Sequence, residues 1–368
     1  MAQEPPELQQ LRAHLAEAGA RWYAAETPIA ALSLTEKRRS LGAEPPAGAV
    51  QLQEREERAK ARLAATAAPA AGVPASWDWR QADGGNYVTD IRDQGRCGSC
   101  VAFGTVAAVE STTRVKAKNP NLAVDSSEAH LFYCHGAAVG RNCDNGWWPN
   151  QALDAYKSIG VVDEACFPYH AGDQACSPCS DWQSRVKKIT GWQSLTSADQ
   201  MKSWLSKNGP LISCFVVYDD FMHYGGGIYH HISGQRLGGH CICIIGYNDT
   251  EGCWTAKNSW GPDWGEKGFF RIRYGEVGID YEMWGVDVPV TTDTTPTELK
   301  QRKITGIWIV DQGKNAAALI DGVGWKKIPN TDPVVFTAML GALVSAKAAQ
   351  SLCNIRLEGE YIKELYVF

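Results

Sequence analysis

Cysteine is concentrated in one part of this chain of 368 residues. Eleven of the twelve cysteines lie from Cys97 to Cys253, and none precedes Cys97. This density predicts a domain cross-linked by disulfides, which form in oxidising compartments. We therefore expect a secreted protein or one of another oxidising compartment, whether periplasmic, extracellular or lysosome-like. The first residues, M-A-Q-E-P-P-E, do not form a signal peptide, so we expect the targeting segment to have been removed before this numbering begins.

A zinc site is the alternative interpretation of the close pair Cys176 and Cys179. The pair has the C-x-x-C spacing of zinc ligands, but no second pair follows at the distance of a zinc ribbon. The sequence therefore predicts no metal site, and nothing in it indicates a cofactor.

Charge and hydropathy exclude two classes of partner. The formal net charge of -5 leaves no basic stripe that could neutralise phosphates, so we do not expect nucleic acid. The longest apolar stretch, Pro333 to Ala349, is interrupted by Gly341 and Lys347 and is too short to span a bilayer. It is expected to be a buried helix, and we predict no membrane span.

Composition separates an N-terminal segment, residues 1–75, from the rest of the chain. It contains no cysteine and is rich in Ala, Glu and Arg, with Leu8, Leu11 and Leu15 at helical spacing. The sequence S-L-T-E that begins at Ser33 is a capping box, which predicts the start of another helix. The segment ends in an Ala/Pro-rich stretch typical of exposed, cleavable linkers.

The rest of the chain divides into a body over residues 76–290, a linker over 291–300 and a small unit over 301–368. Apolar and turn patterns in the last unit predict the order β-β-α-β-β, with one strand from Ala316 to Ile328 and a helix capped by Asp332. The unit contains no cluster of titratable residues that suggests chemistry. We therefore expect it to have a binding or stabilising role, with a possible ligand of its own.

The strongest chemical signal is Q-G-R-C-G-S-C over residues 94–100. A cysteine is a useful nucleophile as a thiolate, and the N-terminus of a helix lowers the pKa of the thiol. The ten residues after Cys100, V-A-F-G-T-V-A-A-V-E, have the composition of a buried helix, so Cys100 is expected to begin that helix. From these residues alone, a redox or disulfide pair of Cys97 with Cys100 stays open, since C-x-x-C also opens a helix in thioredoxin-like proteins.

Two further motifs follow in order, G-G-H-C-I-C-I-I-G-Y over residues 238–247 and K-N-S-W-G over residues 257–261. Together with Q-G-R-C-G-S-C, they resemble the nucleophile, histidine and asparagine motifs of papain and the cathepsins. The resemblance covers about residues 75–290 and implies the α+β, two-lobed papain-like fold, with one helical lobe and one barrel-like β lobe. It also implies a cysteine peptidase, a hydrolase that acts on proteins or peptides.

The resemblance assigns catalytic roles to four residues. Cys100 would attack the scissile carbonyl, and His240 would hold the thiolate and then protonate the leaving amine. Asn258 would orient the His240 ring, and Trp260 would shield that hydrogen bond from water. The side chain of Gln94 and the backbone amide of Cys100 would stabilise the oxyanion. Taken singly, each has a structural explanation, but their joint occurrence favours the catalytic one.

Specificity residues follow from the same resemblance. C-D-N-G over residues 143–146 is similar to the C-N-G-G of the family, whose backbone pairs with extended substrate, and Asn145 replaces the first glycine before Gly146. Other substrate-binding positions are Gly239, next to His240, and Trp260. The S2 pocket is expected to have walls at Trp148 and Cys214 and a base at Glu282, which would accept Arg as well as a hydrophobic residue at P2.

Among its relatives, the sequence looks most similar to cathepsin B, but it lacks the occluding-loop insertion, so we expect an endopeptidase. The family implies the disulfides Cys97–Cys143 and Cys134–Cys176, and Cys166–Cys179 is a further hypothesis. The N-terminal segment, with A-R-W-Y at residues 20–23, is similar to a short cathepsin B-type propeptide. It would lie in the cleft in the reverse direction to substrate until cleavage near residues 70–75. An acyl-transferase or ligase of this fold and a non-catalytic binding protein are the alternatives.

Overall fold

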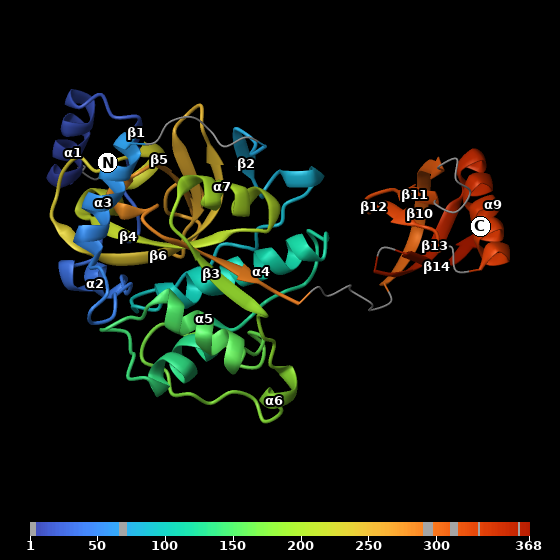
Figure 1. Cartoon of the computed structure of the whole chain (residues 1–368), viewed down its shortest axis with the longest axis horizontal. Helices are drawn as coiled ribbons and strands as arrows, with labels where there is room; N and C mark the ends of the chain where they lie inside the picture. The colour runs from blue at the N-terminus through green and yellow to red at the C-terminus, as the bar shows by residue number, and fades with distance from the viewer. Residues whose placement is uncertain (1–4, 66–71, 290–296, 310–315, 330–331, 360) are drawn as a thin grey trace. The chain divides into compact units, whose positions relative to one another are not determined.

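The computed structural model describes residues 5–65, 72–289, 297–309, 316–329, 332–359 and 361–368. The chain forms two compact units, Met1–Pro289 and Val290–Phe368, each with its own hydrophobic core (Figure 1). Residues 70 and 71 of the predicted cleavage region and residues 291–296 of the predicted linker lie outside the described residues. Residues 297–300, predicted to be linker, instead begin a strand.

The N-terminal segment contains short elements that pack on the body. Its helices are α1 (Pro6–Glu17), α2 (Leu34–Arg39) and α3 (Leu52–Ala65), and its strand is β1 (Trp22–Ala24). The three leucines of α1 are buried, and α2 begins with the predicted capping box, in which Ser33 and Glu36 bond each other's backbone amides. Strand β1 pairs antiparallel with β5 (Tyr224–Tyr229), so the segment extends the main sheet of the body.

The helical part of the body surrounds α4 (Cys100–Lys116), whose first thirteen residues are all buried. Small and apolar side chains allow this helix to be enclosed on every side. Helix α5 (Pro149–Ser158) packs on it, and the same part of the body contains α6 (Trp182–Arg185), a π-helical turn (His130–Gly136) and a 3-10 turn (Ala82–Gly84). All three predicted disulfides form here, Cys97–Cys143, Cys134–Cys176 and Cys166–Cys179. Cys176 and Cys179 are thus in separate disulfides, which excludes the zinc alternative.

The other part of the body is a nine-stranded sheet in the order β1-β5-β8-β7-β6-β4-β9-β3, with β2 paired to β6. Its remaining strands are β2 (Ser76–Asp78), β3 (Gly191–Leu195), β4 (Leu211–Tyr218), β6 (Arg236–Asn248), β7 (Cys253–Lys257), β8 (Phe269–Arg273) and β9 (Met283–Asp287). Helices α7 (Ala198–Lys207) and α8 (Asp219–Met222) and a 3-10 turn (Glu276–Gly278) connect them. Helix α4 packs on β6, so these two elements bring the first two motifs together.

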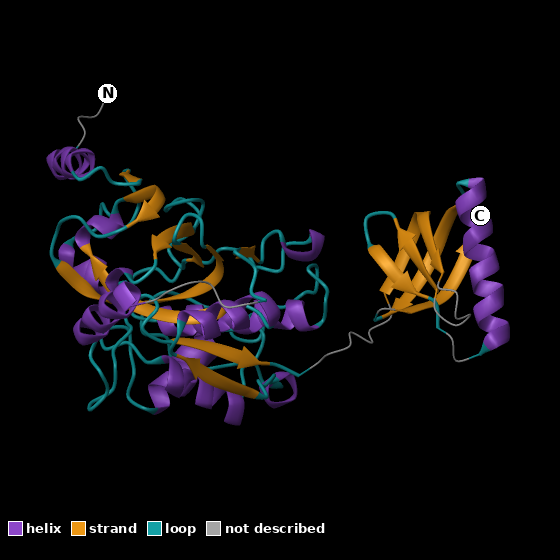
Figure 2. Cartoon of the chain, turned by 45° about the horizontal axis from the view of Figure 1, so that its top comes forward, coloured by secondary structure: helices purple, strands orange, loops and turns teal. Residues whose placement is uncertain are grey.

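The C-terminal unit is a closed barrel of five strands in the order β10-β11-β12-β14-β13 (Figure 2). Its elements are β10 (Thr297–Ile309), β11 (Ala316–Ile320), β12 (Gly324–Lys327), α9 (Pro333–Ala349), β13 (Leu352–Glu358) and β14 (Tyr361–Val367). The prediction of one strand over 316–328 is wrong, because the chain turns at Asp321–Gly322, where Gly322 has φ +70°. The observed order is β-β-β-α-β-β.

Helix α9 also differs from the prediction of a buried helix. Only Leu343 and Ala346 are fully buried, while Val334, Val335 and Val344 are exposed. Within the described ranges, every helix falls short of the length and apolarity that a membrane crossing requires. Nor do the described side chains gather three or more potential metal ligands in one place.

Candidate active site

Cys100 is the first residue of α4, as predicted, and its side chain is fully buried. Burial raises the pKa of the Cys100 thiol far above its ordinary value, and the nearby Cys214 adds to this effect. Backbone amides of Cys241, Gly42 and Val101 oppose the rise. The sulfur therefore lies among amides from the helix start, from the residue after His240 and from the N-terminal segment, and the thiol is protonated.

His240 is held by the third motif. Its Nε2–H donates to Asn258 Oδ1 at 2.8 Å, and its ring stacks on Trp260 with ring centroids 4.5 Å apart. This bond makes Nδ1 the basic nitrogen of the neutral ring, and Nδ1 forms no hydrogen bond with any described residue. Burial lowers the pKa of His240 to about 4, although the bond to Asn258 opposes this shift. The imidazole is therefore neutral in this form of the protein.

Gln94 is fully buried and its amide is fixed at both ends. Its Oε1 accepts a hydrogen bond from Ser259 Oγ at 2.6 Å, which orients Nε2 in the opposite direction. Nε2 donates to the carbonyl oxygens of Cys97, at 2.8 Å, and of Ser40, at 3.1 Å. A carbonyl of the N-terminal segment is thus bound to the donor that was predicted to stabilise an oxyanion.

The N-terminal segment crosses this site as extended backbone. The amides of Gly42 and Ala43 both donate to the carbonyl oxygen of Gly239 at 3.0 Å. On the other side, Trp147 N–H donates to the Gly42 carbonyl at 2.8 Å, and Glu44 N–H donates to the Trp147 carbonyl at 3.0 Å. The bridge between Ala43 and Trp147 is parallel. The N-terminal segment therefore pairs with Gly239, as predicted for substrate, and with Trp147, the residue after Gly146.

The glycines at positions 42, 98 and 146 allow this close approach. A Cβ on Gly42 would lie 2.1 Å from the carbonyl oxygen of Gly98, and a Cβ on Gly146 would lie 2.1 Å from the Gly42 oxygen. Both are impossible contacts with backbone atoms. Asn145, in contrast, is exposed and closes a turn, because its Oδ1 accepts from the amide of Asn142 at 2.8 Å.

An arginine of α3 occupies the predicted S2 pocket. The Arg55 Nη1 lies 2.8 Å from Glu282 Oε2, and the guanidinium lies 4.7 Å from the ring centroid of Trp148 and 4.9 Å from that of Tyr281. Arg55 and Glu282 are both largely shielded from solvent. The predicted pocket residues Trp148 and Glu282 therefore converge on one cation. Cys214 lies opposite Cys241 on β4 and β6, close to Cys100.

Ion pairs join α2 to three separate segments of the body. Lys37 pairs with Asp219 at 3.3 Å, Glu36 pairs with Arg96 at 2.6 Å, and Arg39 pairs with Asp144 at 2.9 Å. Arg96 lies in the motif that precedes the nucleophile. Apart from the Lys37 side chain, these partners are partly or largely exposed, so each pair contributes little by itself and the set mainly fixes the position of α2.

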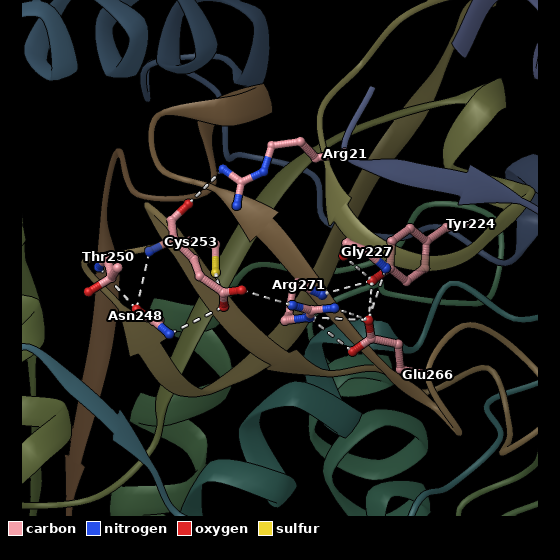
Figure 3. A network of polar contacts seen from close by, with 9 residues as sticks. Arg21, Tyr224, Gly227, Asn248, Thr250, Cys253, Glu266 and Arg271 are labelled. Carbon is pink, nitrogen blue, oxygen red and sulfur yellow. Dashed lines mark hydrogen bonds and ion pairs between the residues drawn. The ribbon is translucent and has the colours of Figure 1, made fainter. Parts of the chain in front are cut away.

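Figure 3 shows a polar network beside the docked strand β1. The Arg21 guanidinium donates to the Glu251 carbonyl oxygen at 3.1 Å, and Arg271 pairs with Glu251 at 3.6 Å and with Glu266 at 2.9 Å. Glu266 also accepts a hydrogen bond from the amide of Gly227 in β5 at 3.0 Å. The network ties β5 and the N-terminal segment to β8.

Sequence reasoning missed Arg55, Ser40 and Ser259 as parts of this site. Ser259 lies inside the K-N-S-W-G motif, so its position was available as a signal. Arg55 lies in a charged helix with several arginines and glutamates, and nothing local distinguishes it from Arg58. Ser40 acts through its carbonyl group, which no sequence pattern reveals.

Residues 73–286 match the family model described as papain family cysteine protease. "Cathepsin B-like CP3" of Giardia intestinalis is 35% identical over 226 residues, which cover 58% of this chain and 74% of that protein. "Cathepsin B-like CP2" of the same organism is 37% identical over 216 residues, covering 55% of this chain and 70% of that protein.

Solved structures of proforms share the fold. ProCathepsin B S9 from Trypanosoma congolense gives a TM-score of 0.61 at 23% identity and covers 77% of this chain and 98% of that one. Procathepsin L 3 of the Tenebrio molitor larval midgut gives a TM-score of 0.60 at 22% identity, covering 78% and 95%. Since the family match spans more than half of the residues, this chain belongs to the papain family of cysteine proteases.

Proposed function

We propose that this papain-family protease is a cysteine endopeptidase of protein or peptide substrates, held inactive by residues 1–75. The observation that carries the proposal is the backbone of residues 40–44, which occupies the positions where a substrate would pair. Ser40 provides a carbonyl to Gln94, and Gly42 is paired on both sides by Gly239 and Trp147. The parallel bridge of Ala43 with Trp147 supports a chain direction opposite to that of substrate.

In the proposed mechanism, departure of the N-terminal segment returns water to the buried pair. The thiol of Cys100 then transfers its proton to His240 Nδ1, and the thiolate attacks the scissile carbonyl carbon. Nε2 of Gln94 and the amide of Cys100 donate to the developing oxyanion. The imidazolium, oriented by Asn258, protonates the leaving amine, and water hydrolyses the thioester with His240 as base.

For specificity, we propose that S2 accepts Arg as well as a hydrophobic residue. The contacts of Arg55 support this, because its guanidinium joins a carboxylate at 2.8 Å to aromatic faces. The propeptide would thus fill S2 with the type of side chain that the pocket selects in a substrate.

The test uses the purified chain, matured at mildly acidic pH under reducing conditions. It should cleave fluorogenic peptides with Arg at P1 and either Phe or Arg at P2. Cys100→Ala should abolish cleavage and leave the thermal unfolding temperature unchanged. Equal activity of the Cys100→Ala protein would contradict the assignment.

Glu282→Ala tests the pocket separately. The rate with Arg at P2 should fall at least about tenfold relative to the rate with Phe, because the charge-assisted hydrogen bonds are lost. Asp287→Ala, on the exposed end of β9, is the control and should leave the ratio unchanged. An unaltered ratio in Glu282→Ala would remove the pocket assignment.

An acyl-transferase or ligase of this fold would share Cys100, His240 and the orienting Asn258 but favour an amine over water. Mass analysis of the products formed with a competing amine distinguishes the two, and hydrolysis should dominate. A non-catalytic binding protein would usually have lost Cys100 or His240, and this chain retains both.

The three disulfides indicate an oxidising compartment. We propose that the protein is secreted or lies in another oxidising compartment, such as the periplasm or a lysosome-like organelle.

A further inference from the structure

The C-terminal barrel presents aromatic side chains to solvent. Trp308 on β10 and Trp325 on β12 are each 52% exposed, and Tyr361 on β14 is 42% exposed. Large aromatic side chains are normally used to fill a core, so several of them on one face of a small domain mark an interaction site. The core of the barrel is closed without them, by residues such as Ala318, Ile320 and Ile355.

Strand register places these residues on one outer face. Trp308 lies opposite Ala317 on β11, Ala317 lies opposite Lys327 on β12, and Lys327 lies opposite Tyr361 on β14. Directly paired residues point to the same side of a sheet, so the four form one cross-strand row. The Lys327 ammonium also lies over the Tyr361 ring, 6.0 Å from its centroid.

A second row adjoins the first. Gly306 lies opposite Leu319, and Leu319 lies opposite Trp325. A Cβ on Gly306 would lie 3.1 Å from Cη2 of Trp325, so the indole reaches across β11 to β10. Trp308 follows Gly306 by two residues on the same side of the strand, about 7 Å along it. The two indoles are therefore neighbours, and Gly306 and Ala317 leave a low surface beside them.

The charges indicate what kind of molecule fits this face. Among the described residues of the two rows, Lys327 is the single charged side chain. Residues 290–368 contain nine lysines and arginines against eight aspartates and glutamates. A single-stranded nucleic acid would also stack on indoles, but it requires a positively charged groove along its phosphates. A neutral ligand with flat rings fits the composition better.

We propose that this face, defined by Trp308, Trp325, Lys327 and Tyr361, binds a neutral oligosaccharide. The flat face of a pyranose ring presents partially positive C–H groups to the negative face of an indole, and its hydroxyls remain available to the lysine ammonium and the tyrosine hydroxyl. Two indoles on successive rows can hold neighbouring rings of one sugar chain. The five-stranded order with a helix between the third and fourth strands is that of the OB-fold, in which the face of the second and third strands binds oligosaccharides or oligonucleotides.

Such binding would hold the attached peptidase close to glycan-bearing material and raise its effective concentration there. It would add a function that is independent of Cys100, so the test uses the full-length Cys100→Ala chain. That variant removes proteolytic loss of the barrel and makes the outcome independent of the proposed peptidase activity.

The probes are insoluble cellulose and chitin, assayed by co-sedimentation, and soluble xylan, assayed by affinity electrophoresis. At least one polysaccharide should bind, and Trp308→Ala and Trp325→Ala should each weaken binding by about tenfold or more. Tyr366→Ala is the matched control, because Tyr366 is exposed on the same unit but pairs with Asn354 on β13. It should bind as the parent does, and all variants should keep the unfolding temperature of the parent.

Four results would overturn the proposal. They are the absence of binding to all three polysaccharides, undiminished binding by both tryptophan variants, tryptophan-dependent binding of oligo-dT in place of sugar, and a concentration-dependent dimer that Trp308→Ala abolishes. The third would assign the face to nucleic acid, and the fourth to a second copy of this chain.

Discussion

At the scale of single residues, the precursor keeps its two reactive groups uncharged. Burial raises the pKa of Cys100 and lowers that of His240 to about 4. At neutral pH, Cys100 is therefore a thiol and His240 a neutral imidazole. Burial is the largest cause of both shifts, and the amide of Gly42, from the N-terminal segment, lies against the Cys100 sulfur. The thiolate is therefore expected only after the segment leaves.

Alkylation of Cys100 tests this expectation. With iodoacetamide at neutral pH, Cys100 should react at least about a hundredfold faster after the N-terminal segment has been removed, because reaction requires an accessible thiolate. Peptide mapping by mass spectrometry follows each cysteine separately. Cys353, buried in the C-terminal barrel, is the internal control and should not change. Equal labelling of Cys100 in both forms would contradict the proposed protection.

The positions of Cys100, His240, Asn258 and Gln94 could be predicted because each lies in a short motif whose local spacing identifies it. Arg55 could not be predicted, because its role depends on a pocket built by Trp148 and Glu282, far away in the chain. The orientation of Asn145 toward its own turn was equally inaccessible, since it depends on which neighbouring amide its side chain reaches.

At the scale of elements, the segment after α2 can lie close to the backbone of the body because glycines, which have no side chain, meet at the contact. Gly42 passes between Gly98 and Gly146, where backbone atoms leave no room for a methyl group. The capping box at Ser33 fixes the start of α2 and thereby the point at which the chain enters the cleft. Backbone fit, with several weak ion pairs at α2, therefore holds this part of the segment in place.

Gly42→Ala should weaken self-inhibition by about tenfold or more, because overpacking against backbone costs roughly 1–3 kcal/mol. The measurement is the residual activity of the unprocessed chain on a fluorogenic peptide before any cleavage is detected. Gln53→Ala, an exposed change on α3, is the control and should be silent. A Gly42→Ala precursor as inactive as the parent would show that the close approach is not needed for inhibition.

Acidification should weaken the docking of α2 through the ion pair of Glu36 with Arg96. Hydrogen bonds from the Ser33 hydroxyl and amide, together with the charge of Arg96, lower the pKa of Glu36 from its ordinary value of 4.5. Because its pKa is depressed, the Glu36 carboxylate stabilises the docked form fully at pH values above its ordinary pKa. This stabilisation is lost as the pH falls through the lowered pKa. Self-processing should therefore accelerate below about pH 4.5.

Glu36→Gln keeps the capping box but removes the charge. It should speed processing near pH 6 by about two- to threefold, a small effect because the carboxylate is exposed, and the difference should vanish in strong acid. Glu54→Gln, whose partner Arg58 lies in the same helix, is the control. An unchanged rate for Glu36→Gln near pH 6 would exclude this contribution.

Elements were predicted best where one local pattern decides them. The leucines of α1, the S-L-T-E cap of α2 and the small residues of α4 each specify a helix through neighbouring positions. The turn at Asp321–Gly322 was missed although Asp-Gly is a turn signal, because the apolar residues on both sides suggested one continuous strand. Strand β1 was missed because its three residues are extended only when β5 pairs with them.

At the scale of the whole molecule, the two units have separate cores. Deletion of residues 290–368 should leave kcat/KM on small peptides unchanged within about twofold, because every proposed catalytic position lies in the first unit. Calorimetry of the full chain should resolve two transitions, and the deletion should remove one of them. A large loss of activity would show that the barrel supports the peptidase fold.

Loss of the N-terminal segment also changes the boundary of the main sheet. Once Trp22–Ala24 departs, β5 becomes an outer strand with unpaired amides and carbonyls, a condition that favours unwanted association between molecules. Gly225, Gly226 and Gly227, which let Tyr23 and Trp22 lie close above them, also make β5 a poor template for another strand, with Gly227 at φ +96°. The glycines that accommodate the precursor would thus help keep the matured molecules from aggregating.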